Sequence, residues 1–200
     1  MKLLQITSSP RGSESSSTML ANKITNKIKE AYPDIQVTQR DLIKEPHPLI
    51  DTFTLNALFT EPQDRTIEQK NRVMLDDILI EQVMDADIIV IGSPMYNFGI
   101  PVQLKAWLDA ICRVGTTFSY DENGSMGLVH GKKVYLAASR GGNYLGMPED
   151  YQLPYLQHVL GFLGMTDINL VVAEGLDMGP DAQQAGYANA HKQLNNISIG

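Results

Sequence analysis

Short apolar runs alternate with longer amphipathic segments along almost the whole chain, and this alternation constrains the fold more than any other feature. Brief runs of Ile, Val and Leu are typical of buried strands. Parallel strands need a long crossover between them, usually a helix, so the alternation predicts repeated βαβ units. The expected strands are Lys2–Thr7, Ile35–Arg40, Asp87–Ser93, Lys133–Ala138 and Ile168–Ala173.

The segments between these runs carry apolar residues about three or four positions apart, the spacing of an amphipathic helix. The residues that mark these helices are Leu20, Ile24, Ile28 and Ala31; less regularly Ile67, Met74, Ile78 and Val83; and Leu104, Trp107 or Leu108, and Ile111. Two closing helices are expected near Asp150–Leu163 and Pro180–Ile197. Five strands joined by right-handed crossovers favour a doubly wound α/β sheet in the order 2-1-3-4-5 with helices on both faces, and a single Rossmann half is the competing topology.

One segment does not follow the alternation. Residues 41–65 are long for a connection, rich in Pro and aromatic at Phe53 and Phe59. We expect them to form an inserted excursion rather than a crossover helix. The chain has 200 residues, of which 43% are hydrophobic, so a single domain over residues 1–200 can bury a substantial core.

The composition disfavours several partners and chemistries. A net charge of -7 without a run of Lys and Arg would repel nucleic acid and anionic lipid. The apolar stretches are too short to span a bilayer, and we expect a cytoplasmic protein without membrane or nucleic-acid partners. Cys112 lies on an apolar helix face and is expected in the core rather than as a nucleophile. The four histidines stand apart from one another, so no metal is implied.

The first candidate site is the serine-rich segment Ser8–Thr18. Ligands of open α/β sheets bind outside the carboxyl ends of the strands, so the loops after the first, third and fourth strands are examined first. This loop ends where the first helix begins, and free N–H groups at a helix N-terminus favour an anion. A monophosphate would fit. The alternative is a flexible turn with an ordinary N-cap.

The loop after the third strand, Ser93–Pro101, combines Met95, Tyr96, Asn97 and Phe98. Its Pro and Gly residues fix a backbone that is not helical, while Tyr and Phe offer flat apolar surface and Asn both donates and accepts hydrogen bonds. This combination suits a planar heterocycle with polar edges. The alternative is that Tyr96 and Phe98 cap the core.

The loop after the fourth strand reads Ser139-Arg140-Gly141-Gly142-Asn143-Tyr144. Two adjacent glycines permit a close approach of the backbone to a ligand, and backbone conformations closed to other residues. Three unusual loops at one sheet edge are harder to explain by chance than any one of them. Together they favour a cofactor site at this edge.

With these loops, the sequence resembles the FMN-dependent NADH-azoreductases of bacteria, within the flavodoxin-like quinone reductase superfamily. The resemblance runs nearly end to end, and its most specific stretches are Pro94–Phe98, Ser139–Gly142, and Gly115–Phe118 through Asn123-Gly124. It implies that Ser9, Ser15, Ser16 and Ser17 hold the phosphate of FMN, that Met95, Tyr96, Asn97 and Phe98 line its isoalloxazine ring, and that Ser139, Arg140, Gly141 and Gly142 cover its pyrimidine end. Arg140 would either neutralise negative charge on the flavin or sit in solvent.

The resemblance also implies a homodimer whose active sites lie at the subunit interface, where aromatic side chains of the partner help to form the acceptor pocket. The candidates for this pocket are Phe59, Phe118, Tyr120 and Phe162. A place in the ordinary core is the simpler interpretation of Phe162.

The function implied is the reduction of quinones and aromatic azo compounds by NADH, through ping-pong two-electron transfer on FMN. No side chain is expected as an essential acid or base, because the cofactor carries the chemistry. The alternative is a flavodoxin-like electron carrier without a small-molecule substrate, which the long segment 41–65 disfavours. The G-x-S-x-G, Walker and G-x-G-x-x-G motifs are all absent from the sequence.

Overall fold

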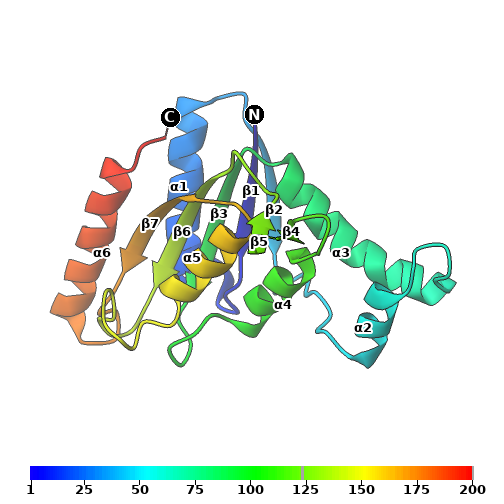
Figure 1. The fold of residues 1–200 in the computed structure, drawn as a ribbon. Helices are drawn as coiled ribbons and strands as arrows, with labels where there is room; N and C mark the ends of the chain where they lie inside the picture. Colours follow the sequence, from blue (N-terminus) through cyan, green and yellow to red (C-terminus); the bar gives the residue numbers. More distant parts are fainter. Residues whose placement is uncertain (123, 200) are drawn as a thin grey trace.

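The computed structural model describes residues 1–122 and 124–199, and its centre is a five-stranded parallel sheet. The strands are β1 (Lys2–Thr7), β2 (Gln36–Asp41), β3 (Ile88–Pro94), β6 (Lys133–Ser139) and β7 (Asp167–Ala173). Their order is β2-β1-β3-β6-β7 (Figure 1). The predicted order 2-1-3-4-5 is therefore confirmed, and each predicted strand lies within one residue of an observed one.

Helices cover both faces of the sheet (Figure 1). One face carries α1 (Ser16–Ala31) and α6 (Pro180–Asn196), and the other carries α3 (Ile67–Asp85), α4 (Val102–Ile111) and α5 (Leu153–Phe162). The predicted helices are thus confirmed, with ends that differ by a few residues. In the described part of the chain, no helix is long and apolar enough to cross a membrane.

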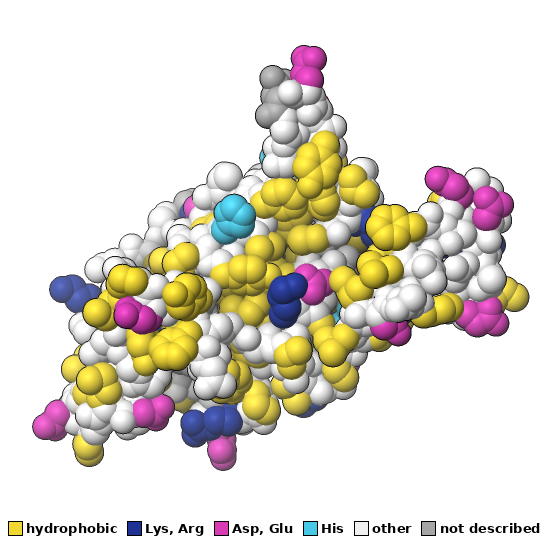
Figure 2. Space-filling model, turned by 60° about the horizontal axis from the view of Figure 1, so that its bottom comes forward, with side chains coloured by type: hydrophobic (Ala, Val, Ile, Leu, Met, Phe, Trp, Pro, Cys, Tyr) yellow, Lys and Arg dark blue, Asp and Glu magenta, His cyan; other side chains and the backbone are white. Residues whose placement is uncertain are grey.

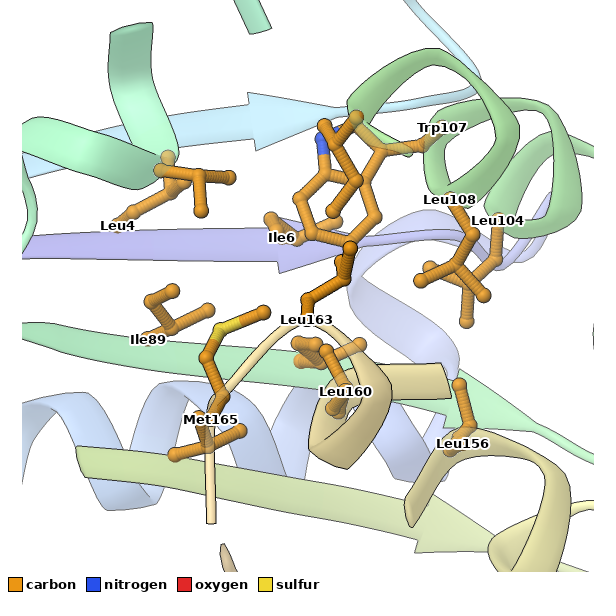
Figure 3. Packing of buried hydrophobic residues seen from close by; sticks show 14 of the residues in the cluster. Leu4, Ile6, Ile89, Leu104, Trp107, Leu108, Leu156, Leu160, Leu163 and Met165 are labelled. Carbon is orange, nitrogen blue, oxygen red and sulfur yellow. The ribbon is translucent and has the colours of Figure 1, made fainter. Parts of the chain in front are cut away.

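The larger of the two hydrophobic cores lies between the sheet and helices α3, α4 and α5. Figure 3 shows Trp107 of α4 beside Ile6 of β1, with Leu163 and Met165 from the segment after α5. Cys112, at the end of α4, is half-buried against this core. Burial raises the pKa of its thiol to about 11, so the thiol stays protonated at neutral pH and is a poor nucleophile, as expected.

Two elements depart from the sequence interpretation. The excursion contains a helix, α2 (Thr52–Phe59), whose N-cap residue Asp51 accepts a hydrogen bond from the Thr54 backbone at 2.7 Å. An antiparallel hairpin of β4 (Phe118–Asp121) and β5 (Gly124–Gly127) lies between α4 and β6 and was not predicted. Asn123, part of the stretch that carried the resemblance, lies outside the described residues.

Helix α3 is confirmed, but of the four apolar residues that marked it in the sequence only Val83 is buried. Its interior residues include Val73, Ile80 and Val83, whereas Ile67 and Met74 are 74% and 52% exposed. Ile78, one turn after Met74, is also exposed. The helix therefore presents apolar side chains on two sides, and the sheet covers only one of them.

A buried charge cluster around Asp76 of α3 holds the excursion in place. The Asp76 carboxylate accepts hydrogen bonds from Arg72 at 2.5 Å and Arg113 at 3.1 Å, and lies 2.8 Å from Nε2 of His47. Arg72 in turn donates from Nε to the Thr54 hydroxyl of α2 at 3.0 Å. One carboxylate thus connects α3 to the excursion and to Arg113 in the segment after α4.

We predict that Asp76→Asn lowers the free energy of unfolding by about 3 kcal/mol at pH 7, because it leaves buried cations without their counter-charge. Burial alone would raise the pKa of Asp76, but the hydrogen bonds from His47 and Arg72 and the charge of Arg72 lower it below its ordinary value. The stability from Asp76 is therefore full above the unfolded value of 3.8 and is lost as pH falls through the lower folded value. Urea denaturation at pH 7 and in acid measures both effects.

The matched control is Asp77→Asn, because Asp77 is 57% exposed and forms its ion pair with Arg113 at 3.2 Å. Exposed ion pairs contribute little, so this variant should keep nearly the full stability of the parent chain. Equal losses in the two variants would contradict the role given to Asp76.

Candidate functional site

The carboxyl ends of β1, β3, β6 and β7 meet around a hollow of about 160 Å³ that is open to solvent, here called the edge hollow. It is lined by Ser9, Arg11, Glu14, Ser15, Ser16, Pro94, Met95, Tyr96, Ser139, Arg140, Gly141, Leu176, Asp177, Gln183 and Tyr187. All three loops singled out from the sequence contribute to it. Their expected meeting at one sheet edge follows from the parallel arrangement of the strands.

The serine loop ends in a helix N-terminus whose side chains leave the first turn uncapped. Ser15 is the N-cap residue of α1, yet its hydroxyl makes no capping hydrogen bond and instead lies 3.0 Å from the Ser17 hydroxyl. The N–H groups of a first helical turn have no partner within the helix. Ser15 and Ser16 line the edge hollow, so uncapped donors and hydroxyl groups lie beside an open space that suits an anion.

Two tyrosines from other elements fix the serine loop. The Tyr187 hydroxyl of α6 lies 2.8 Å from the Ser16 hydroxyl, and the Tyr96 hydroxyl lies 3.4 Å from that of Ser9. The first turn of α1 also packs closely on β3, since a Cβ at Gly92 would lie 3.2 Å from the Ser17 carbonyl oxygen. The loop is therefore a built part of the edge rather than a free serine-rich turn.

The loop after β3 turns sharply at Asn97 and Phe98. Tyr96 and Gly99 exchange two backbone hydrogen bonds of 3.0 Å, and the residues between them have φ angles of 48° and 70°. This is the backbone of a tight two-residue turn whose second position is usually Gly. A Phe in this conformation stores strain of order 1–3 kcal/mol, which proteins retain mainly at functional sites.

Arg140, in the loop after β6, is fully buried and ion-paired. Its guanidinium bonds Asp150 at 2.9 Å and Glu174 at 3.2 Å, and its Nε donates to Gln152 at 3.1 Å. The side chain does not sit in solvent, so that expectation was wrong, while its neutralisation of negative charge on the flavin stays a prediction. The reason is that a buried guanidinium needs acceptors, and Asp150, Glu174 and Gln152 supply them from inside the protein.

The two glycines of this loop make room for the chain itself. A Cβ at Gly141 would lie 2.4 Å from the Asp177 carboxylate, and one at Gly142 would lie 2.9 Å from the Tyr144 ring. Neither residue has a positive φ angle. The expectation of backbone conformations closed to other residues is thus wrong here. The close approach to a ligand stays a prediction, and the groups that approach the two glycines in this structure are Asp177 and Tyr144.

The structure brings most of the predicted cofactor residues to the edge hollow. Ser9, Ser15, Ser16, Met95, Tyr96, Ser139, Arg140 and Gly141 line it. Ser17 is fully buried and contacts Ser15 of the lining, whereas Asn97, Phe98 and Gly142 do not line the hollow.

The four predicted acceptor-pocket aromatics lie outside the edge hollow. Phe118 contacts Tyr120 and Phe162, with ring centroids 5.6 and 4.6 Å apart, on the β4–β5 side. Phe118 and Phe162 are half-buried against the larger core, as the simpler interpretation of Phe162 implied. Phe59, on α2, is 84% exposed and makes no ring contact within the described residues.

The sequence interpretation missed one side of the hollow, formed by Leu176, Asp177, Gln183 and Tyr187. These residues follow β7, the last strand of the sheet. The rule that directed attention to the loops after three strands applies equally to this one. Applying it to every strand would have found them.

The edge hollow thus offers hydroxyls and a helix N-terminus, together with Met95 and Tyr96 from the loop after β3. The first group suits a phosphate and the second a planar ring. Figure 2 shows hydrophobic side chains gathered across this side of the molecule, which looks toward the carboxyl ends of the strands.

Comparison with known proteins gives consistent results. A family model described as flavodoxin-like fold matches residues 1–197. The chain is 51% identical over 197 residues to an FMN-dependent NADH:quinone oxidoreductase of Dechloromonas aromatica, covering 98% of this chain and 99% of the relative. Its backbone is similar to that of an azoreductase from Bacillus anthracis, with a TM-score of 0.89, 31% identity, and 98% and 97% of the two chains covered.

A second solved structure is described as an FMN-dependent NADH-azoreductase from Bacillus anthracis in complex with FMN. It matches with a TM-score of 0.86 and 26% identity, and 98% of each chain is covered. The relatives are therefore similar over the whole length of this chain rather than over one part of it.

The strain at Phe98 leads to a prediction about stability. Phe98→Ala and Phe98→Gly both remove the ring and its edge contact with Tyr144, whose centroid lies 5.6 Å away. Only glycine relieves the positive φ angle. Thermal and urea unfolding should therefore find Phe98→Gly more stable than Phe98→Ala by about 1 kcal/mol. An alanine variant as stable as the glycine variant would show that the turn is unstrained.

Proposed function

Because the chain belongs to the family of FMN-dependent NADH:quinone oxidoreductases with the flavodoxin-like fold, we propose that it reduces quinones and aromatic azo compounds with NADH as the electron donor. The observation that carries the proposal is the edge hollow, which is lined by the N-terminus of α1 and by Met95 and Tyr96 of the loop after β3. We place this activity in the cytoplasm and assign it to one FMN-binding domain formed by residues 1–200.

The residues of the edge hollow fit FMN. Ser9, Ser15 and Ser16, with the uncapped first turn of α1, would hold the phosphate, and buried Ser17 supports them through Ser15. Met95–Phe98 and Ser139–Gly142 would flank the isoalloxazine ring. When bound, FMN supplies two-electron hydride chemistry, and the protein groups bind and orient.

No side chain is assigned as an essential acid or base. The guanidinium of Arg140 is committed to Asp150 and Glu174, so its role is to position the Gly141-Gly142 backbone rather than to touch the reacting atoms. Glu174 extends this support, because it also accepts hydrogen bonds from the backbone N–H groups of Tyr144 and Leu145, both at 2.7 Å.

The alternative is an electron carrier of the same fold without a small-molecule substrate. The excursion argues for an enzyme, since a bare carrier has no evident use for a helix anchored by buried charges beyond the sheet. Steady-state oxidation of NADH by the FMN-loaded protein, with and without an added quinone, separates the two functions. An electron carrier would show no sustained turnover.

We further propose that the protein acts as a homodimer, with aromatic side chains of each subunit completing the site of the other. The proposal is supported by the exposed apolar side of α3, which includes Ile67 and Met74, and by the exposed rings of Phe59 and Tyr120. A single chain gains nothing from leaving such groups in water. Multi-angle light scattering should report a dimer, and a fully active monomer would contradict the shared site.

Ser16→Asp is predicted to weaken FMN binding about tenfold or more. The side chain of Ser16 lines the edge hollow, so a carboxylate there would face the phosphate at a distance where like charges repel by one or more kcal/mol. Titration of the protein with FMN, followed by flavin fluorescence, measures the change without depending on turnover.

The control is Ser13→Asp, which places the same charge in the same loop on an exposed residue outside the edge hollow. Its FMN affinity should stay within about twofold of the parent value, because the charge is screened by solvent. If both variants bind FMN equally well, the phosphate is held elsewhere.

The shape of the site also predicts the kinetic order. Both substrates need stacking distance from the same ring face, between the loops at Met95–Phe98 and Ser139–Gly142, so the oxidised nucleotide must leave before the quinone enters. Double-reciprocal plots against NADH at several quinone concentrations should give parallel lines. Converging lines would show a ternary complex and require two separate substrate sites.

A further inference from the structure

Several hydroxyl groups of the serine loop are arranged in pairs. Within hydrogen-bond distance of each other lie the hydroxyls of Ser9 and Tyr96 at 3.4 Å, of Ser15 and Ser17 at 3.0 Å, and of Ser16 and Tyr187 at 2.8 Å. One hydroxyl of a pair donates its hydrogen to the other, so the pair keeps one hydrogen for a ligand. The direction of the bond decides which oxygen carries that hydrogen.

This direction matters because charge alone does not select an anion in the edge hollow. Among the residues that the structure describes, the charged side chains of the lining are two cations, Arg11 and Arg140, and two anions, Glu14 and Asp177. Arg140 is moreover committed to ion pairs within the protein. A phosphate here therefore depends on neutral donors, which are the N–H groups of the first turn of α1 and the hydrogens of the hydroxyl groups.

The position of Tyr187 is fixed by the packing of α6. Its ring packs against the smaller core, which lies between the sheet and helices α1 and α6. The preceding residue is Gly186, where a Cβ would overlap the carbonyl oxygen of Glu174, so the absence of a side chain lets α6 lie close to the segment after β7. Gln193 bonds both backbone groups of Val172 in β7, at 2.8 and 3.3 Å. The Tyr187 hydroxyl is thus held at the edge hollow by its own helix.

The chemistry of the two hydroxyls favours Tyr187 as the donor. A phenol is a stronger hydrogen-bond donor than an aliphatic alcohol, so the Ser16 oxygen is the better acceptor of the pair. Ser16 is the first residue of α1 and lines the edge hollow beside the uncapped first turn. When Tyr187 donates, the hydrogen of Ser16 is free, and a phosphate that can only accept would receive it as a charge-assisted bond.

We propose that Tyr187 is a positioning residue of the phosphate site: its hydroxyl donates to the Ser16 oxygen and thereby directs the Ser16 hydrogen onto a phosphate oxygen of FMN. The two residues lie 171 positions apart in the sequence, so the last helix of the chain orients a donor of the first loop. The inference rests on the proposed function, since it concerns the cofactor of that reaction.

The test compares FMN with riboflavin, which has the same ring system but no phosphate. Tyr187→Phe removes the hydroxyl and keeps the ring that packs on the core. It should raise the dissociation constant for FMN about fivefold, the effect of losing the net contribution of one hydrogen bond. The dissociation constant for riboflavin should not change. Fluorescence titration of the flavin-free full-length chain with each flavin measures both values.

A double-mutant cycle on FMN binding tests whether Tyr187 acts through Ser16. In the Ser16→Ala background, Tyr187→Phe should cause no further loss, because the hydroxyl that it orients is already gone. The matched control is Tyr32→Phe. Tyr32 packs on the same core and donates to the Ile199 carbonyl at 3.2 Å, but it does not line the edge hollow. This variant should bind FMN within about twofold of the parent, because one equally conservative change elsewhere leaves the site intact.

The outcomes distinguish this inference from the proposed function. If Tyr187→Phe leaves FMN affinity unchanged, or weakens FMN and riboflavin equally, the inference fails while the function stands. A further loss in the Ser16→Ala background would show that Tyr187 acts independently of Ser16, which also overturns it. If the parent chain does not bind FMN, the proposed function itself fails. A loss of FMN affinity that disappears in the Ser16→Ala background supports the inference, and this cycle does not depend on measurable binding of riboflavin.

Discussion

The buried guanidinium of Arg140 is the constraint on which the functional edge depends. It stands at the carboxyl end of β6 and is bonded to Asp150, Gln152 and Glu174, so three segments that follow β6 and β7 are fixed to one another. Gln152 continues the network to Ser93 of β3, donating to its carbonyl at 2.9 Å. Removing a charge from such a buried set is far costlier than breaking a surface pair, which makes the edge rigid where a ligand must be aligned.

The strained turn at Asn97 and Phe98 is joined to this edge by the backbone. The residue that leads into it, Met95, donates its N–H to the Ser139 carbonyl at 2.8 Å, which ties the turn to the strand that ends at Arg140. Strain of this kind persists when the surrounding structure over-determines the backbone. The two loops expected to flank a planar ring are therefore one mechanical unit, although they lie far apart in the sequence.

The sequence predicted the sheet because apolar runs such as Ile88–Ile91 indicate buried strands. The rule that ligands of open α/β sheets bind outside the carboxyl ends of the strands then located three of the loops. Prediction from the sequence failed where long-range partners decide the outcome. Nothing near Arg140 in the sequence reveals that Asp150 and Glu174 bury it, and the spacing of Ile67, Met74 and Ile78 predicts a helix without showing which side the sheet covers. Helix α2 was missed although its N-cap Asp51 is a local signal for a helix start. The prolines of residues 41–65 argued against a helix there.

The exposed side of α3 is a part of the surface that a single chain leaves incomplete. Ile67 and Met74 lie on it, while Val73, Ile80 and Val83 of the same helix are buried. Burying an apolar side requires no hydrogen-bond donors, so this side suits a second protein surface rather than a polar ligand. The same helix thus contributes to the core on one side and supports the proposed dimer on the other.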